Sequence, residues 1–327
     1  MTRLALLLAA LVAALFLASL TIGPAGVGPG ESLRALVAGD GGPLTLVMRE
    51  IRLPRALLAA IVGASLGLAG AAMQGYLRNP LAEPGLIGVS GAAALGAVIA
   101  LQTGLAASWA LGLPAAALAG ALAAVLLVVA LAGPRGTSLT LILAGIAISA
   151  LAAALTSLVL NLSPNPFAAS EIVFWMMGSL ADRSMTDVWI ALPFTALGWA
   201  LLMTMGRGLD ALTLGEDAAG ALGIRLGRLQ AALVLGTASA VGAATAVAGT
   251  IGFVGLVVPH LLRPLVGARP SRLLWASALG GAAMVLAADI AVRLVLPERD
   301  LKLGVLTALV GAPLFLHLIY RTRREMG

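Results

Sequence analysis

The side chains that could carry out chemistry are few in this chain. It has one lysine, Lys302, two histidines, His260 and His317, and no cysteine. Lys302 does not follow a glycine-rich loop, so the chain lacks the Gly-x-x-x-x-Gly-Lys-Ser/Thr cradle that binds nucleotide phosphates. The missing cysteines exclude disulfides, thiolate metal sites and cysteine nucleophiles. We therefore expect neither a P-loop ATPase nor a cysteine-based site.

Two glycine motifs imitate catalytic signatures. The run Gly63-Ala64-Ser65-Leu66-Gly67 matches the Gly-x-Ser-x-Gly elbow of hydrolases, but it lies inside a helical apolar pattern and not at a strand-to-helix turn. Residues 206–211 imitate a dinucleotide fingerprint without a preceding strand. Gly63 and Gly67 are more typical of a helix packing face. A membrane hydrolase built on Ser65 is therefore the weakest interpretation.

Ionisable side chains inside apolar runs are the remaining candidates. No acidic cluster accompanies either histidine, so we expect both to be polar groups satisfied within a helix bundle or at its rim, with metal or haem ligation as the alternative. Asp289 stands inside an apolar run, where an ionised group is a functional candidate by default. Arg293, one helical turn later, is its expected partner. The alternative is that both side chains pair and extend toward the aqueous surface.

The elements that must position these residues are membrane helices. Of the 327 residues, 61% are hydrophobic and only 10% are charged, with 40 glycines and a mean hydropathy of +1.06. A water-soluble core of this size needs more polar surface. The apolar residues are mainly Ala, Leu, Val and Gly, which favour close helix packing over the strands of a barrel. We predict an all-α, polytopic integral membrane protein that forms one transmembrane domain over residues 1–327.

Apolar runs of about 17 to 25 residues, the length that crosses a bilayer, define about ten candidate spans. They are 4–22, 53–77, 86–102, 113–132, 139–161, 188–205, 229–250, 251–268, 272–296 and 304–320. An even number of spans places both termini on one side. The boundary between 229–250 and 251–268 has no polar break and is the least secure. A cleaved signal peptide is the alternative for the first run, although that run is long for a signal core and no Ala-x-Ala site follows.

The charged residues lie in short islands between these runs. The net charge is +6, and if the N-terminus is cytoplasmic the inside islands carry the excess of basic residues, as the positive-inside rule predicts. The basic tail of Arg321, Arg323 and Arg324 is more typical of an anchor at anionic lipid than of a nucleic-acid site. We expect two cytoplasmic termini, a lipid bilayer around the chain and no nucleic-acid partner.

One island, residues 210–228, has the pattern of a short helix that needs a packing partner. Thr213 and Glu216 have the spacing of a capping box, and Gly223 is a fitting C-terminal stop. The apolar residues of this helix, in a loop that should be wet, are Leu214, Ala218, Ala219 and Leu222. A helix this short is marginal alone and must pack on something. It packs either on its own membrane domain or against a cytoplasmic subunit that binds it.

A series of local motifs runs in order from about Arg52 to Tyr320. They are Arg52-Leu53-Pro54-Arg55, Gln74-Gly75, Arg78-Asn79-Pro80-Leu81-Ala82-Glu83-Pro84, Gly88-Val89-Ser90, Trp175-Met176-Met177-Gly178-Ser179-Leu180, Leu214-Gly215-Glu216, Gly249-Thr250-Ile251-Gly252-Phe253-Val254-Gly255-Leu256, Pro259-His260 and Gly311-Ala312-Pro313. Together they resemble the permease subunits of ATP-binding-cassette (ABC) importers for ferric siderophores, haem and cobalamin. The resemblance implies a ten-span subunit with the type II ABC importer permease fold, in the bacterial cytoplasmic (inner) membrane.

The resemblance also implies partners. It predicts a homodimer with the translocation path along its interface, two ABC ATPase subunits on the cytoplasmic side and one periplasmic substrate-binding protein on the other side. The permease is then not an enzyme and carries no cofactor, because ATP and Mg²⁺ are bound by the ATPase.

Individual residues receive roles by the same resemblance. In a coupling loop of about 207–228, the residues expected at the ATPase are Asp210, Thr213, Leu214, Gly215, Glu216, Asp217, Ala218, Leu222 and Gly223. The outward-facing arginines expected to dock the binding protein are Arg52, Arg55 and Arg293. The expected cytoplasmic gate residues are Asn79, Leu81, Thr137 and Ser138. No residue is expected to be catalytic or to hold a metal.

The chain departs from the family pattern before the last span. It reads Asp300-Leu301-Lys302-Leu303-Gly304, with lysine where the family commonly has proline, which puts the detailed docking surface in doubt. No residue pattern lining the pore identifies the cargo, and importers of this type leave cargo recognition largely to the binding protein. We rank an iron chelate, haem or ferric siderophore, ahead of cobalamin. An ATPase-independent secondary transporter is the rival from another class. Buried acid relays or broken-helix ion sites in two repeated halves would favour it, and Asp289 alone is a poor relay.

Overall fold

The computed structural model describes residues 2–23, 27–38, 41–133, 138–163, 166–295 and 301–326. Within these ranges every regular element is a helix, so the all-α prediction is confirmed. The elements are α1 (Thr2–Thr21), α2 (Pro29–Ala38), α3 (Pro43–Leu46), η1 (Val47–Arg52), α4 (Leu53–Leu77), η2 (Pro84–Ile87), α5 (Val89–Gln102), α6 (Leu105–Ser108), α7 (Gly112–Ala132), α8 (Ser138–Asn161), α9 (Pro166–Met176), α10 (Met185–Thr204), α11 (Gly206–Leu212), α12 (Glu216–Ala221), α13 (Leu226–Ala248), α14 (Val254–Leu262), η3 (Pro264–Val266), α15 (Pro270–Val295) and α16 (Leu303–Met326).

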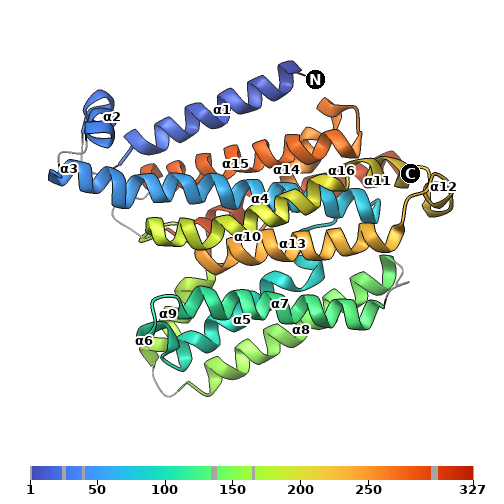
Figure 1. Ribbon diagram of the computed structural model, residues 1–327, viewed down its shortest axis with the longest axis horizontal. Helices are drawn as coiled ribbons and strands as arrows, with labels where there is room; N and C mark the ends of the chain where they lie inside the picture. Colours follow the sequence, from blue (N-terminus) through green and yellow to red (C-terminus); the bar gives the residue numbers. More distant parts are fainter. Residues whose placement is uncertain are drawn as a thin grey trace.

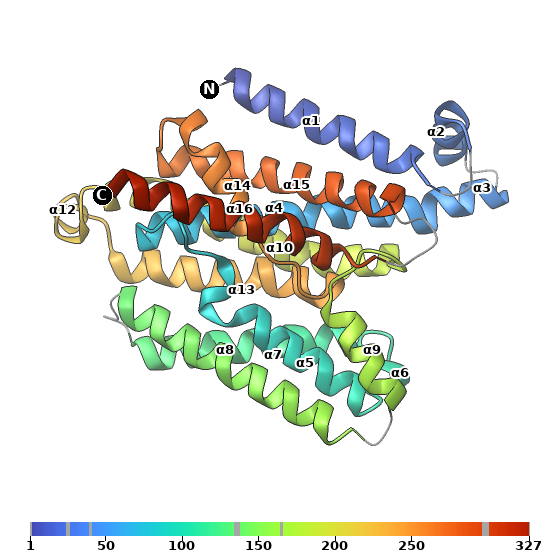
Figure 2. The ribbon, with the colours of Figure 1, turned by 180° about the vertical axis from the view of Figure 1, so that it is seen from behind.

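The long helices run side by side along the longest axis of the molecule (Figure 1). α1 lies on the outside against α15, and α15 lies along α4, which forms the centre together with α10 and α13. α5, α7 and α8 form a second group that reaches the centre through α13. Figure 2 shows the start of α1, the end of α16 and α12 at one end of the bundle, which we name the α12 end. The opposite end, with α2, α3, α6 and α9, is the α9 end.

Nine of the ten predicted spans coincide with apolar helices. Seven are long and apolar enough to cross a membrane: Arg3–Thr21, Pro43–Leu77, Gly112–Ala132, Leu139–Asn161, Met185–Thr204, Leu226–Ala248 and Pro270–Val295. Val89–Gln102 and Leu303–His317 are shorter apolar helices. The remaining predicted span, 251–268, contains the nine-residue helix α14 and the turn η3. At 1.5 Å per residue α14 is about 14 Å long, roughly half of the hydrocarbon core of a bilayer.

The helix before Leu77 is longer than the sequence pattern indicates. It continues α3 through the π-helix η1 into α4, so the whole apolar helix covers Pro43–Leu77. Pro54 has no N–H, and in an α-helix its ring would clash with the carbonyl four residues earlier. The N–H of Leu53 instead bonds to the carbonyl of Met48, five residues back. This wider turn before Pro54 lets the helix continue where a proline usually breaks it.

Small residues bring α4 very close to α15 and α14. A Cβ added at Gly63 or Gly67 would overlap the backbone carbonyl of Gly281 or Ser277 on α15. A Cβ at Gly70 would overlap the carbonyl of Gly255 on α14. Because lipid offers no hydrophobic force between helices, such close backbone packing is a main source of their association. The prediction that Gly63 and Gly67 form a packing face is confirmed.

Replacing Gly67 with alanine is expected to destabilise the permease. Alanine favours a helix by about 1 kcal/mol over glycine, but the overlap with α15 must push the helices apart, at a typical cost of about 1–3 kcal/mol. We expect a net loss of thermal stability for the purified protein in detergent. Gly30→Ala on α2 is the matched control, since a Cβ there meets nothing within 4 Å. Equal melting temperatures for Gly67→Ala and the wild type would contradict this packing.

Candidate functional site

The island 210–228 contains the end of α11, all of α12 and the start of α13, at the α12 end. α11 buries Leu209 and Leu212 against the membrane bundle. α12 projects beyond the ends of the long helices (Figure 1). The island therefore has an anchored part, α11, and a projecting part, α12.

Asp210 fastens α11 to the start of α15. Its carboxylate accepts hydrogen bonds from the Ser271 backbone N–H at 2.8 Å, the Ser271 hydroxyl at 2.7 Å and the Arg269 Nε at 2.7 Å. Burial by itself raises the pKa of Asp210, but the bonds from Ser271 and the bond and charge of Arg269 outweigh it and hold this pKa below its usual value. We expected Asp210 at the ATPase surface, whereas its carboxylate is occupied inside the permease.

The predicted capping box at the start of α12 is wrong. Thr213 is the C-cap of α11, and its hydroxyl donates to the carbonyl of Asp210 at 2.7 Å. α12 begins after Gly215, which has a φ of 103°. Only glycine adopts such an angle readily. The turn between the two helices therefore depends on Gly215 and not on a hydroxyl cap.

The end of α12 agrees with the sequence. Gly223 has a φ of 82°. Its N–H bonds to the carbonyl of Gly220 at 2.9 Å, and the N–H of Ile224 bonds to the carbonyl of Ala219 at 3.0 Å. These two bonds are those of a Schellman motif, in which glycine ends a helix. The predicted stop at Gly223 is confirmed.

The apolar residues of the island lie in different environments. Ala219 is fully buried and Ala218 is half-buried, whereas Leu214 and Leu222 are 69% and 64% exposed. The neighbouring acid Asp217 is exposed as well. Leu214 and Leu222, exposed before and after α12, are apolar side chains that suit contact with a protein partner.

Glu216 connects α12 to the end of α4. Its Oε1 lies 3.8 Å from Nη2 of Arg78. Arg78 ends α4 in the left-handed conformation, with a φ of 50°, and is followed directly by the predicted gate residue Asn79. The projecting helix therefore contacts the first residue of the loop between α4 and η2.

The gate residues that the structure describes lie on that loop and at the start of α8. The Asn79 Oδ1 accepts the N–H of Leu81 at 2.9 Å, a local turn that fixes the loop after α4. η2 then packs closely on α8, where a Cβ at Gly145 would overlap the carbonyl of Leu86. Ser138 is the first residue of α8, and Thr137 lies outside the described residues. The packing of η2 on α8 connects the two segments, and their gating role stays a prediction.

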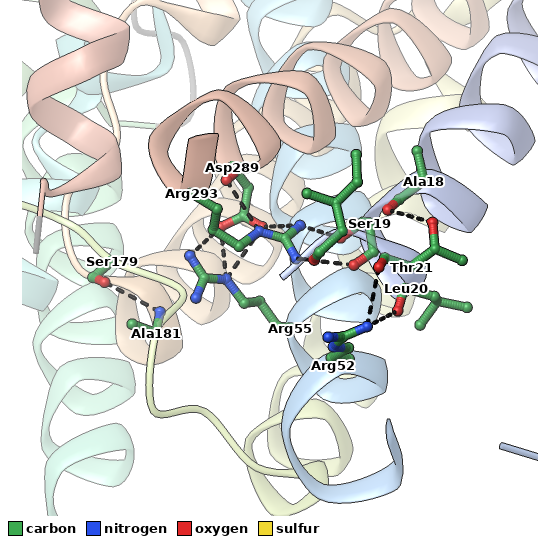
Figure 3. A network of polar contacts seen from close by, with 11 residues as sticks. Ala18, Ser19, Leu20, Thr21, Arg52, Arg55, Ser179, Ala181, Asp289 and Arg293 are labelled. Carbon is green, nitrogen blue, oxygen red and sulfur yellow. Dashed lines mark hydrogen bonds and ion pairs between the residues drawn. The ribbon is translucent and has the colours of Figure 1, made fainter. Parts of the chain in front are cut away.

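A buried ionic cluster joins α4 and α15 at the α9 end (Figure 3). Asp289 is only 1% exposed and accepts Nε of Arg55 at 2.9 and 3.2 Å. Nη2 of Arg55 and Nη2 of Arg293 each lie 2.9 Å from its carboxylate. The predicted pair of Asp289 and Arg293 is confirmed. The alternative, in which both extend to the aqueous surface, is not what the structure shows.

Two of the arginines also hold the C-terminal end of α1. Arg293 donates hydrogen bonds to the carbonyls of Ser19 and Ile22. Arg52 donates to those of Leu20 and Thr21, and all four distances are 2.8–3.1 Å. Carbonyls in the last turn of a helix have no partner within it, and cations are favoured at this end of the helix dipole. Arg52 and Arg293 therefore cap α1 and bind it to the bundle.

The three arginines expected to dock the binding protein are mostly buried in the single chain. Arg52 is 5% exposed, and the side chains of Arg293 and Arg55 are 9% and 19% exposed. Their guanidinium groups already have partners within the chain. A docking role for them stays a prediction, for which Arg55 is the most accessible of the three.

Ser65, His260 and possible metal ligands are the remaining candidates for chemistry. Ser65 is buried in the middle of α4, where its Oγ accepts the indole N–H of Trp199 at 2.9 Å, so it lies on no nucleophile elbow. His260 lies half-buried on α14. In the ranges that the structure describes, no group of three or more His, Cys, Asp or Glu side chains could hold a metal ion.

Three residues of the site were not singled out from the sequence. Arg78 stood within a quoted motif without a role, and Arg269 and Ser271 were not considered. Ser271 follows Pro270 at the first turn of α15, a common start for a helix. That pattern locates the helix start, but no local pattern shows that its cap comes from Asp210, 61 residues earlier.

The comparisons with known proteins identify the family and the fold of this chain. The model of the FecCD transport family matches residues 11–321. An uncharacterised ABC transporter permease of Bacillus subtilis, YvrB, is 41% identical over 293 residues, 88% of this chain and 82% of its own length. The cobalamin import permease BtuC of Halobacterium salinarum is 41% identical over 276 residues, 84% of this chain and 73% of its own.

A solved structure gives the same fold. It is the inward-facing conformation of an ABC transporter assigned to the metal-chelate type, with a TM-score of 0.87 and 33% identity over 98% of this chain and 100% of that one. The family match covers most of the sequence, and the relatives match it over most of their own length. This chain therefore belongs to the FecCD transport family and is a multi-span permease of the ABC importer type.

Proposed function

We propose that this chain is the membrane subunit that moves an iron chelate, haem or a ferric siderophore, into the cytoplasm, driven by ATP hydrolysis on a separate subunit. The observation that carries the proposal is α12, which projects from the bundle with Leu214 and Leu222 exposed. A marginal six-residue helix flanked by two exposed leucines is explained by a soluble partner that covers it. The α12 end, with both termini, then faces the cytoplasm.

The division of the island suggests how the partner moves the permease. α11 is anchored to α15 through Asp210, while α12 contacts Arg78 through a half-exposed ion pair. An ATPase that displaces α12 would therefore act on the loop of Asn79 and Leu81 more directly than on α15. That contact supports the proposed gate role of this loop.

An apolar hollow offers a route for cargo beside α16. It has a volume of about 580 Å³, and its lining includes Met176, Met177 and Phe253 together with Ala308 and Leu309 on α16. Leu309, Val310 and Leu316 on α16 are exposed in the single chain. We place the homodimer contact and the translocation path on this face, with the binding protein above it at the α9 end and Arg55 as its accessible arginine.

Cobalamin is the second candidate cargo. Permeases named for cobalamin or vitamin B12 import are 41% and 39% identical to this chain. The structural neighbour is of the metal-chelate type. A corrinoid and an iron chelate are both large metal-centred ligands, so one route could carry either.

Two measurements test this function. A tagged chain expressed with its own neighbours should co-purify with a P-loop ATPase, and in vesicles it should accumulate cargo only with ATP and that ATPase. Uphill transport by the permease alone would refute the proposal and favour the secondary transporter. The absorption spectrum of cargo held by the binding protein then decides the substrate, since a Soret band indicates haem and corrinoid bands indicate cobalamin.

A further inference from the structure

A second cavity lies at the α12 end, partly within the expected coupling loop of about 207–228. It has a volume of about 450 Å³ and lies where α10 ends and α13 begins. Its lining residues are Thr204, Met205, Arg207, Gly208, Gly223, Ile224, Arg225, Arg228, Leu229 and Ala232.

The charged side chains that line this cavity are all positive. Arg207, Arg225 and Arg228 line it, and no Asp or Glu does. All three arginines are exposed, and within the described ranges none forms an ion pair with a carboxylate. Arg225 is also the N-cap of the 23-residue helix α13, whose dipole adds positive potential at this point. The cavity is therefore built for an anion, and arginine forks fit phosphate oxygens in particular.

The other part of the lining is apolar and belongs to membrane helices. Leu229 and Ala232 lie on the first turns of α13, and Met205 follows α10. Further along the same two helices, Met203 and Leu235 are exposed large apolar side chains. A cavity lined by arginines at the ends of helices that also expose apolar side chains suits a lipid headgroup with acyl chains along those helices.

We propose that this cavity binds the headgroup phosphate of an anionic phospholipid in the leaflet at the α12 end. A water-exposed acidic side chain of an ATPase would not need the apolar half of the lining, so the lipid is favoured. The bound lipid holds the segment 223–228 that directly follows α12, and the inference does not depend on the identity of the cargo.

Lipid retention by the purified full-length chain tests this site. Native mass spectrometry would compare bound phosphatidylglycerol with bound phosphatidylcholine in the wild type and in Arg207→Gln/Arg225→Gln/Arg228→Gln. Each arginine near an anionic lipid contributes about a fivefold gain in affinity, so the triple variant is expected to bind phosphatidylglycerol about a hundredfold more weakly. The corresponding triple lysine variant keeps the charge and should keep most of the binding. Arg3→Gln removes an exposed charge at the same end, outside the cavity, and should change nothing.

Several results would overturn the proposal. Unchanged phosphatidylglycerol binding in the triple glutamine variant would do so directly. Displacement of the lipid by inorganic phosphate at equal concentration would show a site for free phosphate. Loss of lipid binding when an ATPase is added, with the arginines then protected from chemical modification, would show a protein contact. If the triple variant does not fold, Arg228→Gln alone should show a fivefold loss, and no loss there would also overturn the assignment.

Discussion

Glu216→Arg is expected to reduce ATP-driven transport at least tenfold while the protein still inserts and dimerises. Glu216 lies 3.8 Å from Arg78, and the two side chains are 44% and 48% exposed. Such an exposed pair contributes at most about 1 kcal/mol to stability, so the fold should survive. The reversal places two positive charges where α12 meets the loop of the gate, and under the proposed function motion of α12 then no longer reaches Asn79. Transport and cargo-stimulated ATP hydrolysis in reconstituted vesicles measure this.

Two variants separate this effect from a general loss of charge. Asp217→Arg makes the same change on the next residue of α12, whose carboxylate forms no ion pair with Arg78, and should reduce transport less. The double variant Glu216→Arg/Arg78→Glu restores opposite charges and should recover part of the transport. Normal cargo-stimulated turnover in Glu216→Arg would contradict the coupling role.

Asp289→Asn is expected to have the largest effect on stability. The change leaves Arg55 and Arg293 without their shared counter-charge inside the bundle, and breaking a buried ion pair typically costs about 3–5 kcal/mol. The end of α1 should loosen as well, since Arg293 also holds the carbonyls of Ser19 and Ile22. We expect a low yield of folded protein and a lower melting temperature in detergent.

The control for this variant is Asp182→Asn, an exposed aspartate outside the cluster with a φ of 57°, an angle that asparagine tolerates. It should melt like the wild type. Replacing Asp289, Arg55 and Arg293 together with apolar residues removes all three charges and should recover part of the stability, while the contacts of Arg293 with α1 stay lost. A melting temperature of Asp289→Asn equal to that of the wild type would show that the cluster contributes little.

The same cluster changes how docking should be tested. Reversal of Arg52, Arg55 and Arg293 would unpair Asp289 and release α1, so a loss of binding-protein affinity would not by itself identify a docking contact. Arg55→Lys keeps a charge opposite Asp289 and alters only the most accessible arginine. It is the cleaner variant for a measurement of binding-protein affinity.

The sequence by itself determined the class of the protein and most of its helices. Hydropathy over some 20 residues decides whether a segment can cross a bilayer, and this depends only on residues that are neighbours in the chain. Gly223 at the end of α12 was predictable for the same reason, because a left-handed glycine stops a helix through bonds to the preceding turn. The ordered motifs were specific enough to indicate the family.

Only the tertiary structure decided which polar groups meet. Asp210 bonds to Ser271, 61 residues later, and Asp289 bonds to Arg55, 234 residues earlier in the chain. No local sequence pattern predicts such pairings. The capping box failed because Thr213 bonds backward to α11, an equally local alternative to capping α12 that the sequence does not distinguish. The arginines expected at the surface are buried because the carbonyls of α1 and the carboxylate of Asp289 satisfy them there, and a buried charge is stable only where the fold supplies its partner.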